Sequence, residues 1–327
     1  MARPPLPSLP LSALLLPGLW LSGLLAVPGL TDPAAAAPPP PYTVVELGQR
    51  FARLQDAVNA IGDRMATIRI APGTYRDCAI QRAGDIAFVA AQPGRTSLIG
   101  RTCEGKAALV LRGRSARVEG LTFAGLTSPD GNGAGIRLEH GNLVIRRSWF
   151  RDSQQGLLTA SDPAGRVVIE QSTFTRLGTC AGSGGCAHSV YVGHYGELVI
   201  ADSRFEAGVG GHYVKCRAAR VTIRNSSFDD AGGQGTNYMI DLSDGASGQI
   251  SGNWFVQGRN KENHSAFIAV AAEGRKNPSD GLVIAGNNAR FAPGLSWKSA
   301  FVADWSGDPL ALGDNVLARG ILPLERR

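Results

Sequence analysis

The chain has 327 residues, of which 42 are glycine and 7% are aromatic, and its formal net charge is +6 at pH 7. Abundant glycine without a strict Gly-X-Y period excludes collagen, and it disfavours a helical bundle because glycine weakens helix interiors. The basic surplus suits an acidic polymer as partner, although an ordinary solvated surface can carry the same surplus.

The first 41 residues are expected to lie outside the folded domain. Arg3 precedes an apolar run from Leu9 to Leu30, small residues at 34–37 offer a cleavage site, and prolines follow at 38–41. This order is typical of a secretory signal peptide with a stiff linker. The alternative is an uncleaved membrane anchor, which two prolines inside the run oppose. We expect export to the periplasm or the cell exterior, with no stable membrane span after cleavage.

A single domain is predicted over residues 42–327, and it opens with an amphipathic helix over 43–63. The apolar residues at helical spacing are Phe51, Leu54, Ala57, Val58 and Ile61. A strand and a turn follow at 66–75, with the sequence ATIRIAPGTY.

A short motif then recurs along the chain. Its copies read LVIRRSWF, VVIEQSTF, LVIADSRF and VTIRNSSF, with weaker copies at 249–255 and 282–288. The central isoleucines lie 23 to 34 residues apart, which is typical of a repeat architecture. Apolar and polar residues alternate as in a strand, and each copy closes with a turn-forming Ser or Asn. One strand per repeat in the same sense predicts an all-β fold, a single-stranded right-handed parallel β-helix over residues 66–316. The isoleucines expected on one inner face are Ile145, Ile169, Ile200, Ile223 and Ile250.

The five cysteines fit an oxidising compartment. Cys180 and Cys186 flank a short glycine-rich loop and are expected to form a disulfide. Cys78 and Cys103 lie about one repeat apart, so a bridge between neighbouring coils is possible. Cys216 is then left over and is expected to be a buried free thiol.

A second strand precedes each motif copy, and its outward residues form a column. If Val190, Val192, Val214 and Cys216 point inward, the residues between them must point outward. Adjacent strands lie about 4.8 Å apart, so Tyr191, Lys215 and Asp241 should be lateral neighbours.

Several polar residues border this column and form the candidate site. The residues predicted to face one groove are Tyr191, His194, His212, Lys215, Arg217, Asp241, Lys261 and His264, with His188 at its border. The competing interpretation is a solvated face with an ordinary ion pair between Lys215 and Asp241, or with His212 turned inward.

The chain resembles known β-helix families at two places. The helix and the strand ending in Pro-Gly-Thr-Tyr75 resemble the start of pectate-lyase-like proteins, in which the helix caps the first coil. The segment 213–228 resembles the catalytic-lysine coil of chondroitinase-B-type and alginate lyases, which implies that Lys215 is the base. Less specifically, HSVYVG at 188–193 resembles an uncharacterised group of bacterial secreted β-helix proteins, which implies fold and export only.

One departure from the lyase pattern changes the expected roles. The lyases have Arg where this chain has Asp241, and an adjacent carboxylate favours the charged form of a lysine. Lys215 is then better suited to neutralising a uronate carboxylate, and the proton would be taken by His212, His194 or Tyr191. The calcium ligands of that family are not evident, so we expect no cofactor and no metal, with calcium as the alternative left open.

These patterns favour a monomeric secreted protein that acts on an acidic polysaccharide by β-elimination or C5 epimerisation. Lys215 or Arg217 would neutralise the carboxylate, and His212 or Tyr191 would be the base. A non-catalytic carbohydrate-binding or cell-envelope protein is the alternative, and a glycoside hydrolase is a further one. Nucleic acid is not expected as a partner, because no aromatic–basic motif is present.

Overall fold

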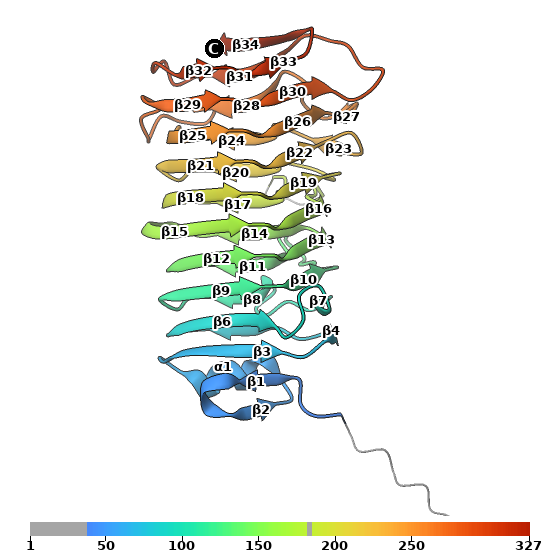
Figure 1. The fold of residues 1–327 in the computed structure, drawn as a ribbon, viewed down its shortest axis with the longest axis vertical. Helices are drawn as coiled ribbons and strands as arrows, with labels where there is room; N and C mark the ends of the chain where they lie inside the picture. The colour runs from blue at the N-terminus through green and yellow to red at the C-terminus, as the bar shows by residue number, and fades with distance from the viewer. Residues whose placement is uncertain (1–37, 182–184) are drawn as a thin grey trace, which may run out of the picture. The chain divides into compact units, whose positions relative to one another are not determined.

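The computed structural model describes residues 38–181 and 185–327. They form a stack of coils in which each coil adds one strand to each of three sheets, a parallel β-helix (Figure 1). The predicted signal peptide lies outside the described residues. Within the described ranges, no helix combines the length and the apolarity that a membrane crossing needs.

The three sheets, which we name A, B and C, follow one another around each coil. Sheet A contains, in spatial order, β2 (Gln49–Phe51), β1 (Tyr42–Val44), β3 (Met65–Ile70), β6 (Asp85–Ala90), β9 (Ser115–Glu119), β12 (Asn142–Arg146), β15 (Asp162–Glu170), β18 (Tyr195–Ala201), β21 (Arg220–Arg224), β25 (Ser247–Ser251), β29 (Leu282–Ala285) and β32 (Ala311–Gly313). Sheet B contains β4 (Gly73–Tyr75), β7 (Thr96–Ile99), β10 (Leu121–Ala124), β13 (Trp149–Ser153), β16 (Thr173–Leu177), β19 (Arg204–Glu206), β22 (Ser227–Asp229), β26 (Trp254–Gln257), β30 (Asn288–Phe291) and β33 (Val316–Leu317). Sheet C contains β5 (Ala79–Gln81), β8 (Ala107–Leu111), β11 (Ala134–Leu138), β14 (Gln155–Thr159), β17 (Val190–Val192), β20 (Val214–Cys216), β24 (Ile240–Leu242), β28 (Ala266–Val270), β31 (Ser299–Asp304) and β34 (Ile321–Arg326). A small separate pair joins β23 (Gln234–Thr236) to β27 (Asn260–Lys261).

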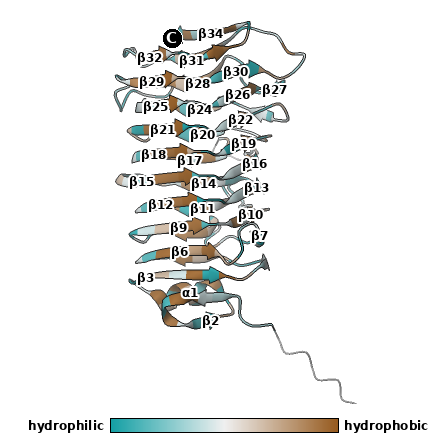
Figure 2. Ribbon diagram, viewed as in Figure 1, coloured by the Kyte–Doolittle hydropathy of each residue, from teal (hydrophilic) through white to brown (hydrophobic). Residues whose placement is uncertain are grey.

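The repeated isoleucines line the inner face of sheet A, as predicted. Ile145 pairs with Ile169, and the same register continues through Ile200, Ile223 and Ile250. Each of these side chains is fully buried. Apolar residues recur along the strands of successive coils in Figure 2, so the interior is a continuous column to which each coil adds one layer.

The end of each motif is a strand of sheet B, which the sequence analysis interpreted only as a turn. Alternation turns one phenylalanine per strand inward, and Phe123, Phe150, Phe174, Phe205 and Phe228 stack with centroid separations of 4.8 to 4.9 Å. Phe255 continues the stack at 5.0 Å. These rings fill the core beside the isoleucines, so the motif encodes two strands and the corner between them.

The Ser or Asn of each motif lies at that corner and bonds to the next coil. The hydroxyl of Ser172 accepts from the backbone N–H of Ser148 at 3.2 Å, and Ser203 does the same for Ser172 at 3.2 Å. Asn253 and Asn287 extend the ladder through their side-chain amides at 3.0 Å. Buried backbone donors at the corner therefore have partners, as buried polar groups require.

The N-terminal cap differs from the predicted helix over 43–63. The helix is only α1 (Leu54–Ile61), because β1 and β2 form a hairpin before it and β1 pairs antiparallel with β3. Leu54, Ala57, Val58 and Ile61 are buried, as their spacing predicted. Phe51 ends β2 and packs against the core from there.

The cysteine predictions are confirmed. Cys180 is bonded to Cys186, and Cys78 is bonded to Cys103 across neighbouring coils. Cys216 is a buried free thiol on the inner side of sheet C, and burial raises its pKa to about 12. Such a thiol is not reactive at neutral pH.

Candidate active site

A cavity of about 300 Å³ lies beside the outer face of sheet C, where the loops leading from sheet B to sheet C end. Successive coils contribute to it, and a loop after β28 closes one side. The lining residues are Gly185, Cys186, His188, Gly211, His212, Lys215, Asn237, Glu262 and Glu273. It thus gathers five titratable side chains besides a disulfide sulfur.

Strand register sets the centre of the site. Tyr191 on β17 lies opposite Lys215 on β20, which lies opposite Asp241 on β24. The lateral arrangement is as predicted, but the column is not a solvated face. Lys215 is only 7% exposed and Asp241 only 2%, because loop residues cover the strands.

Two carboxylates hold the Lys215 ammonium. Lys215 Nζ donates to Asp241 Oδ2 at 2.9 Å and to Glu273 Oε1. Burial alone would lower the pKa of Lys215, but the two carboxylates outweigh burial and raise it. Burial raises the pKa of Asp241 in spite of Lys215, and its Oδ1 has no hydrogen-bond partner. Lys215 is therefore a charged group suited to bind an anion and unsuited to act as a base.

Arg217 stands next to Lys215 and shares Glu273 with it. Its guanidinium donates to the Tyr191 hydroxyl at 3.0 Å, to Asp244 at 2.9 Å and to the second oxygen of Glu273. Glu273 therefore bridges two cations while its side chain remains 45% exposed. Burial opposes ionisation, but Lys215 and Arg217 hold the pKa of Glu273 below its ordinary value.

Two histidines line the cavity beside these charged groups. His188 Nδ1 accepts from the backbone N–H of His212 at 3.0 Å, and the two rings lie 4.9 Å apart. His212 Nε2 lies 3.6 Å from Asp241 Oδ2. Burial, followed by the positive charge of neighbouring groups, lowers the pKa of both histidines well below about 6.5. Both are therefore neutral at pH 7.

Six of the predicted residues do not line the cavity. Tyr191, Arg217 and Asp241 adjoin it through Lys215 and Glu273, and the other three lie elsewhere. His194 bonds to Asp244 at 2.8 Å and so contacts the site only through the partner of Arg217. Lys261 lies on β27, whose pairing turns it inward to Asp230 at 3.3 Å, with both side chains fully buried. His264 bonds to the carbonyl of Arg259 and packs against Trp297. The prediction of one shared groove was wrong for Lys261 and His264.

Glu273 and Asn237 are lining residues that the sequence analysis missed. Both lie on loops outside the repeated strands, so no register argument places them. In the sequence, only its charge marks Glu273 as a candidate, and a charge alone does not show where in the fold a residue lies. Backbone hydrogen bonds to Ser243 hold the Glu273 loop. The N–H of Glu273 donates to the carbonyl of Ser243 at 2.9 Å.

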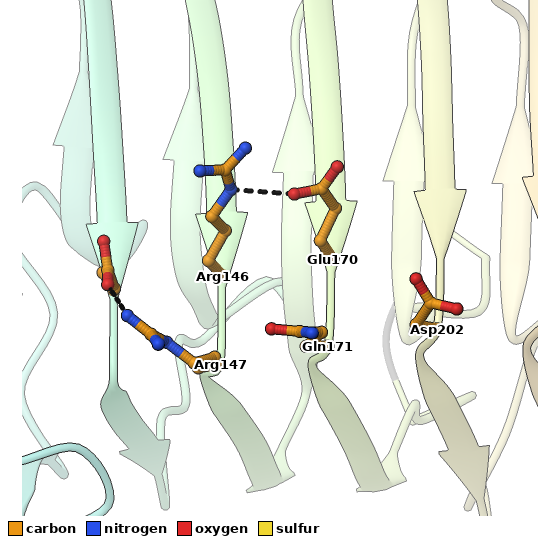
Figure 3. Close-up of a pocket in the computed structure, with 6 residues that line it drawn as sticks. Arg146, Arg147, Glu170, Gln171 and Asp202 are labelled. Carbon is orange, nitrogen blue, oxygen red and sulfur yellow. Dashed lines mark hydrogen bonds and ion pairs between the residues drawn. The ribbon is translucent and has the colours of Figure 1, made fainter.

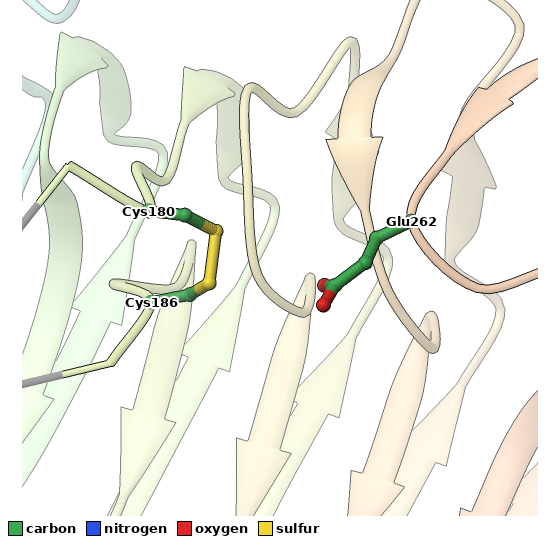
Figure 4. Close-up of side chains that lie close together, drawn as sticks. All are labelled: Cys180, Cys186 and Glu262. Atoms are coloured by element: carbon green, nitrogen blue, oxygen red, sulfur yellow. A yellow bond between two sulfur atoms is a disulfide. The ribbon is translucent and has the colours of Figure 1, made fainter.

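A disulfide forms the outer rim of the cavity. Figure 4 shows the carboxylate of Glu262 turned toward the Cys180–Cys186 bridge. In the described part of the chain, these three residues are the only group close enough to hold a metal ion together. Metal binding by cysteine needs thiolates, which a disulfide does not offer, so the oxidised chain provides no ligand set there.

A second cavity, of about 330 Å³, lies at the corner between sheets A and B. Figure 3 shows its charged side chains on adjacent strands, where Arg146 bonds to Glu170 at 2.8 Å and Arg147 bonds to Glu119. Both arginines are about half exposed and already paired with acids. The row is a mostly exposed ion-pair network in which only Glu119 is buried, so the histidine-lined cavity is the stronger candidate.

Comparison with known proteins supports the fold. No curated protein matches the chain. An alginate lyase from Paenibacillus sp. str. FPU-7 is similar in structure, with a TM-score of 0.66 and 17% identity over 84% of this chain and 95% of that chain. A pectin methylesterase from Aspergillus niger has a TM-score of 0.47 and 13% identity over 86% and 87% of the two chains. The surface protein and adhesin PfbA from Streptococcus pneumoniae has a TM-score of 0.48 and 10% identity over 84% and 94%.

At 17% identity the alginate lyase shows a shared fold alone. The family model described as "Right handed beta helix region" matches residues 107–289, which is more than half of the chain. It agrees with the parallel coils and the inner isoleucine column. The chain therefore belongs to the right-handed β-helix family.

Proposed function

We propose that the chain acts on an acidic polysaccharide by β-elimination or C5 epimerisation at a uronate. One observation carries the proposal: a single half-exposed carboxylate, Glu273, bridges two cations beside two neutral histidines. A uronate carboxylate has the same charge and shape as the carboxylate of Glu273. It can replace Glu273 between Lys215 and Arg217, which would place the sugar ring toward the histidines.

The chemistry of a uronate matches these groups. The C5 proton lies next to the carboxylate, and its removal puts further negative charge there, so a cation pair stabilises the transition state. His212 is neutral and can accept the proton. In elimination the C5–H electron pair forms the C4=C5 double bond as the C4–O4 bond breaks, and the Tyr191 hydroxyl gives its proton to O4. In epimerisation C5 is reprotonated from the opposite face.

Export accompanies this proposal. Two disulfides fit an oxidising compartment, and polysaccharides of this kind lie outside the cytoplasm. We propose that residues 1–41 direct export and that residues 42–327 work as a monomer. Mass determination of the secreted chain would test this, since a retained leader adds the mass of those residues.

The deciding assay exposes the chain from residue 42 onward to alginate, polygalacturonate and chondroitin sulfate. Growth of the ultraviolet absorbance of unsaturated uronates indicates elimination. Deuterium uptake at C5 from heavy water without absorbance indicates epimerisation. Retention on immobilised polysaccharide without any product favours a non-catalytic binding protein and contradicts the proposed enzyme.

The histidine pair gives the activity a defined pH dependence. Because burial lowers the pKa of His212, its neutral form persists below pH 6.5, so kcat/KM should fall only at lower pH. His212→Ala should lower kcat at least about 100-fold, the usual contribution of a general base. His264→Ala, outside the cavity, is the matched control and should leave the profile unchanged. An acidic limb centred above pH 6.5 in the unaltered chain would contradict the assignment of His212.

Removing the charge of Glu273 should strengthen substrate binding. Glu273 competes with the uronate for Lys215 and Arg217, so Glu273→Gln should lower KM a few-fold, roughly the worth of a partly exposed ion pair. Glu262→Gln removes a charge from the same cavity without touching either cation, and it should change KM less. An increase of KM in Glu273→Gln would indicate that Glu273 itself contacts the substrate.

Asp241 and Glu273 favour glycoside hydrolysis as a second candidate. The pKa of Asp241 is raised by burial while that of Glu273 is lowered by its cations, and such separation suits an acid and a nucleophile. Both acids contact the same ammonium, so they are close together. However, Asp241 is almost completely buried and does not line the cavity. New reducing ends without ultraviolet absorbance would select this reaction.

A further inference from the structure

Two tryptophans are exposed on the outer face of sheet B, away from the cavity. Trp149 on β13 is 42% exposed and Trp254 on β26 is 43% exposed. Each stands one residue before a phenylalanine of the inner stack, so strand alternation directs it to the outside. Exposed tryptophan is uncommon because burying its large apolar surface is favourable, so two on one face need an explanation.

The two tryptophans lie in one straight column along the stack. Strand register runs from Trp149 through Thr173, Arg204 and Ser227 to Trp254, one residue per coil. The strands β13, β16, β19, β22 and β26 follow one another in the same order in Figure 1. Four steps of about 4.8 Å separate the rings by about 19 Å along the stack.

Both rings are held in place by polar neighbours. The Arg151 guanidinium lies 5.0 Å from the ring centre of Trp149, and that of Arg290 lies 5.0 Å from the ring centre of Trp254. Trp149 Nε1 donates to Thr175 Oγ1 at 3.2 Å. A ring that is fixed before binding loses little conformational entropy on binding.

We propose that this column, Trp149-Thr173-Arg204-Ser227-Trp254, is a binding surface for a polysaccharide chain that runs along the stack axis. A pyranose ring has an apolar face of C–H groups, which packs on an indole, and hydroxyl groups at its edge, which bond to Thr, Ser and Arg. The class of ligand rests on the proposed function, while the site itself is separate from the cavity.

Other partners fit this face less well. A protein interface has a contiguous apolar centre, whereas here polar residues separate the two rings. Single-stranded nucleic acid also stacks on aromatic rings but needs a positive groove. The central Arg204 is paired with Glu206 at 2.6 Å. Asp229 lies opposite Glu206 on the adjacent strand, so acids accompany this arginine. A sugar chain needs only the rings and the hydrogen-bonding groups between them.

Affinity electrophoresis in gels containing alginate, polygalacturonate or chondroitin sulfate tests the proposal on the chain from residue 42 onward. At least one polymer should retard the unaltered chain, and the double variant Trp149→Ala/Trp254→Ala should lose about tenfold in affinity for it. Each single variant should lose less, and Trp149→Phe should keep part of the affinity. Met65→Ala, which removes another exposed apolar side chain, is the control and should bind normally.

The result separates this surface from the active site. Loss of polymer binding with unchanged turnover of short oligosaccharides supports the proposal. Tryptophan-dependent retardation without any turnover supports the surface and contradicts the proposed enzyme. Equal retardation of the double variant, no retardation by any of the polymers, or stronger retardation by single-stranded DNA would overturn the proposal.

Discussion

Replacing Lys215 with alanine should abolish turnover and also lower the free energy of unfolding by about 3 kcal/mol, because it leaves a buried carboxylate without its partner. From strand alternation alone, Lys215 is expected to point outward into solvent, so that its removal would spare the fold. The structure contradicts this expectation, since Lys215 is 7% exposed and bonded to a carboxylate that is 2% exposed. This loss of stability is at the lower end of the range for breaking a buried ion pair, because Lys215 is also bonded to the half-exposed Glu273.

A double variant separates the two effects. Lys215→Met/Asp241→Asn removes both charges, so it should recover stability to within about 1 kcal/mol of the unaltered chain while remaining inactive. Denaturant unfolding and the uronate assay give the two measurements. Lys298→Ala removes an exposed lysine and should change stability by less than about 0.5 kcal/mol. A Lys215→Ala variant as stable as Lys298→Ala would show that the buried pair is not formed.

The phenylalanine stack should give the largest effect on stability alone. Phe205→Ala is expected to cost about 4 kcal/mol, since it removes a fully buried ring and leaves a cavity that the strands cannot close. Phe205 stacks on Phe174 and Phe228, whereas Phe123 stacks only on Phe150. Phe123→Ala should therefore cost about 1 kcal/mol less, the worth of one aromatic pair.

Denaturant unfolding of both variants measures the difference. Phe205→Leu keeps most of the volume and should lose less than half as much as Phe205→Ala. The activity of the folded fraction should be unchanged, because the ring lies inside the stack and the cavity lies outside sheet C. Equal losses for Phe123→Ala and Phe205→Ala would show that stacking between coils contributes little beyond the burial of each ring.

The periodicity of the sequence was sufficient to predict the coil and the strands of sheets A and C. The isoleucines repeat with one alternation pattern, and a slip of one residue would expose all of them, so their shared register was predictable. Sheet B was missed because its strands directly follow a two-residue corner. Phe150 and its equivalents looked like the end of a motif, while they begin another strand.

The candidate site was predictable only where the repeat places its residues. Tyr191, Lys215 and Asp241 lie on paired strands, so the strand register alone predicts that they are lateral neighbours. Glu273 reaches the same ammonium from a loop that no period describes. Lys261 was misplaced for the same reason, since the short β23–β27 pair turns its side chain inward.

The corner between sheets A and B has a consequence for how this protein can change over evolution. It occupies residues 147–148, 171–172, 202–203 and 225–226 in successive coils, always with the same length and the same bonded Ser. The connections from sheet B to sheet C differ in length: they span 207–213, 230–239 and 258–265, and the last two contain β23 and β27. Insertions can therefore accumulate beside the cavity without disturbing the strand register. One scaffold can acquire new substrates by lengthening loops on a single edge, while the opposite corner keeps the coils aligned.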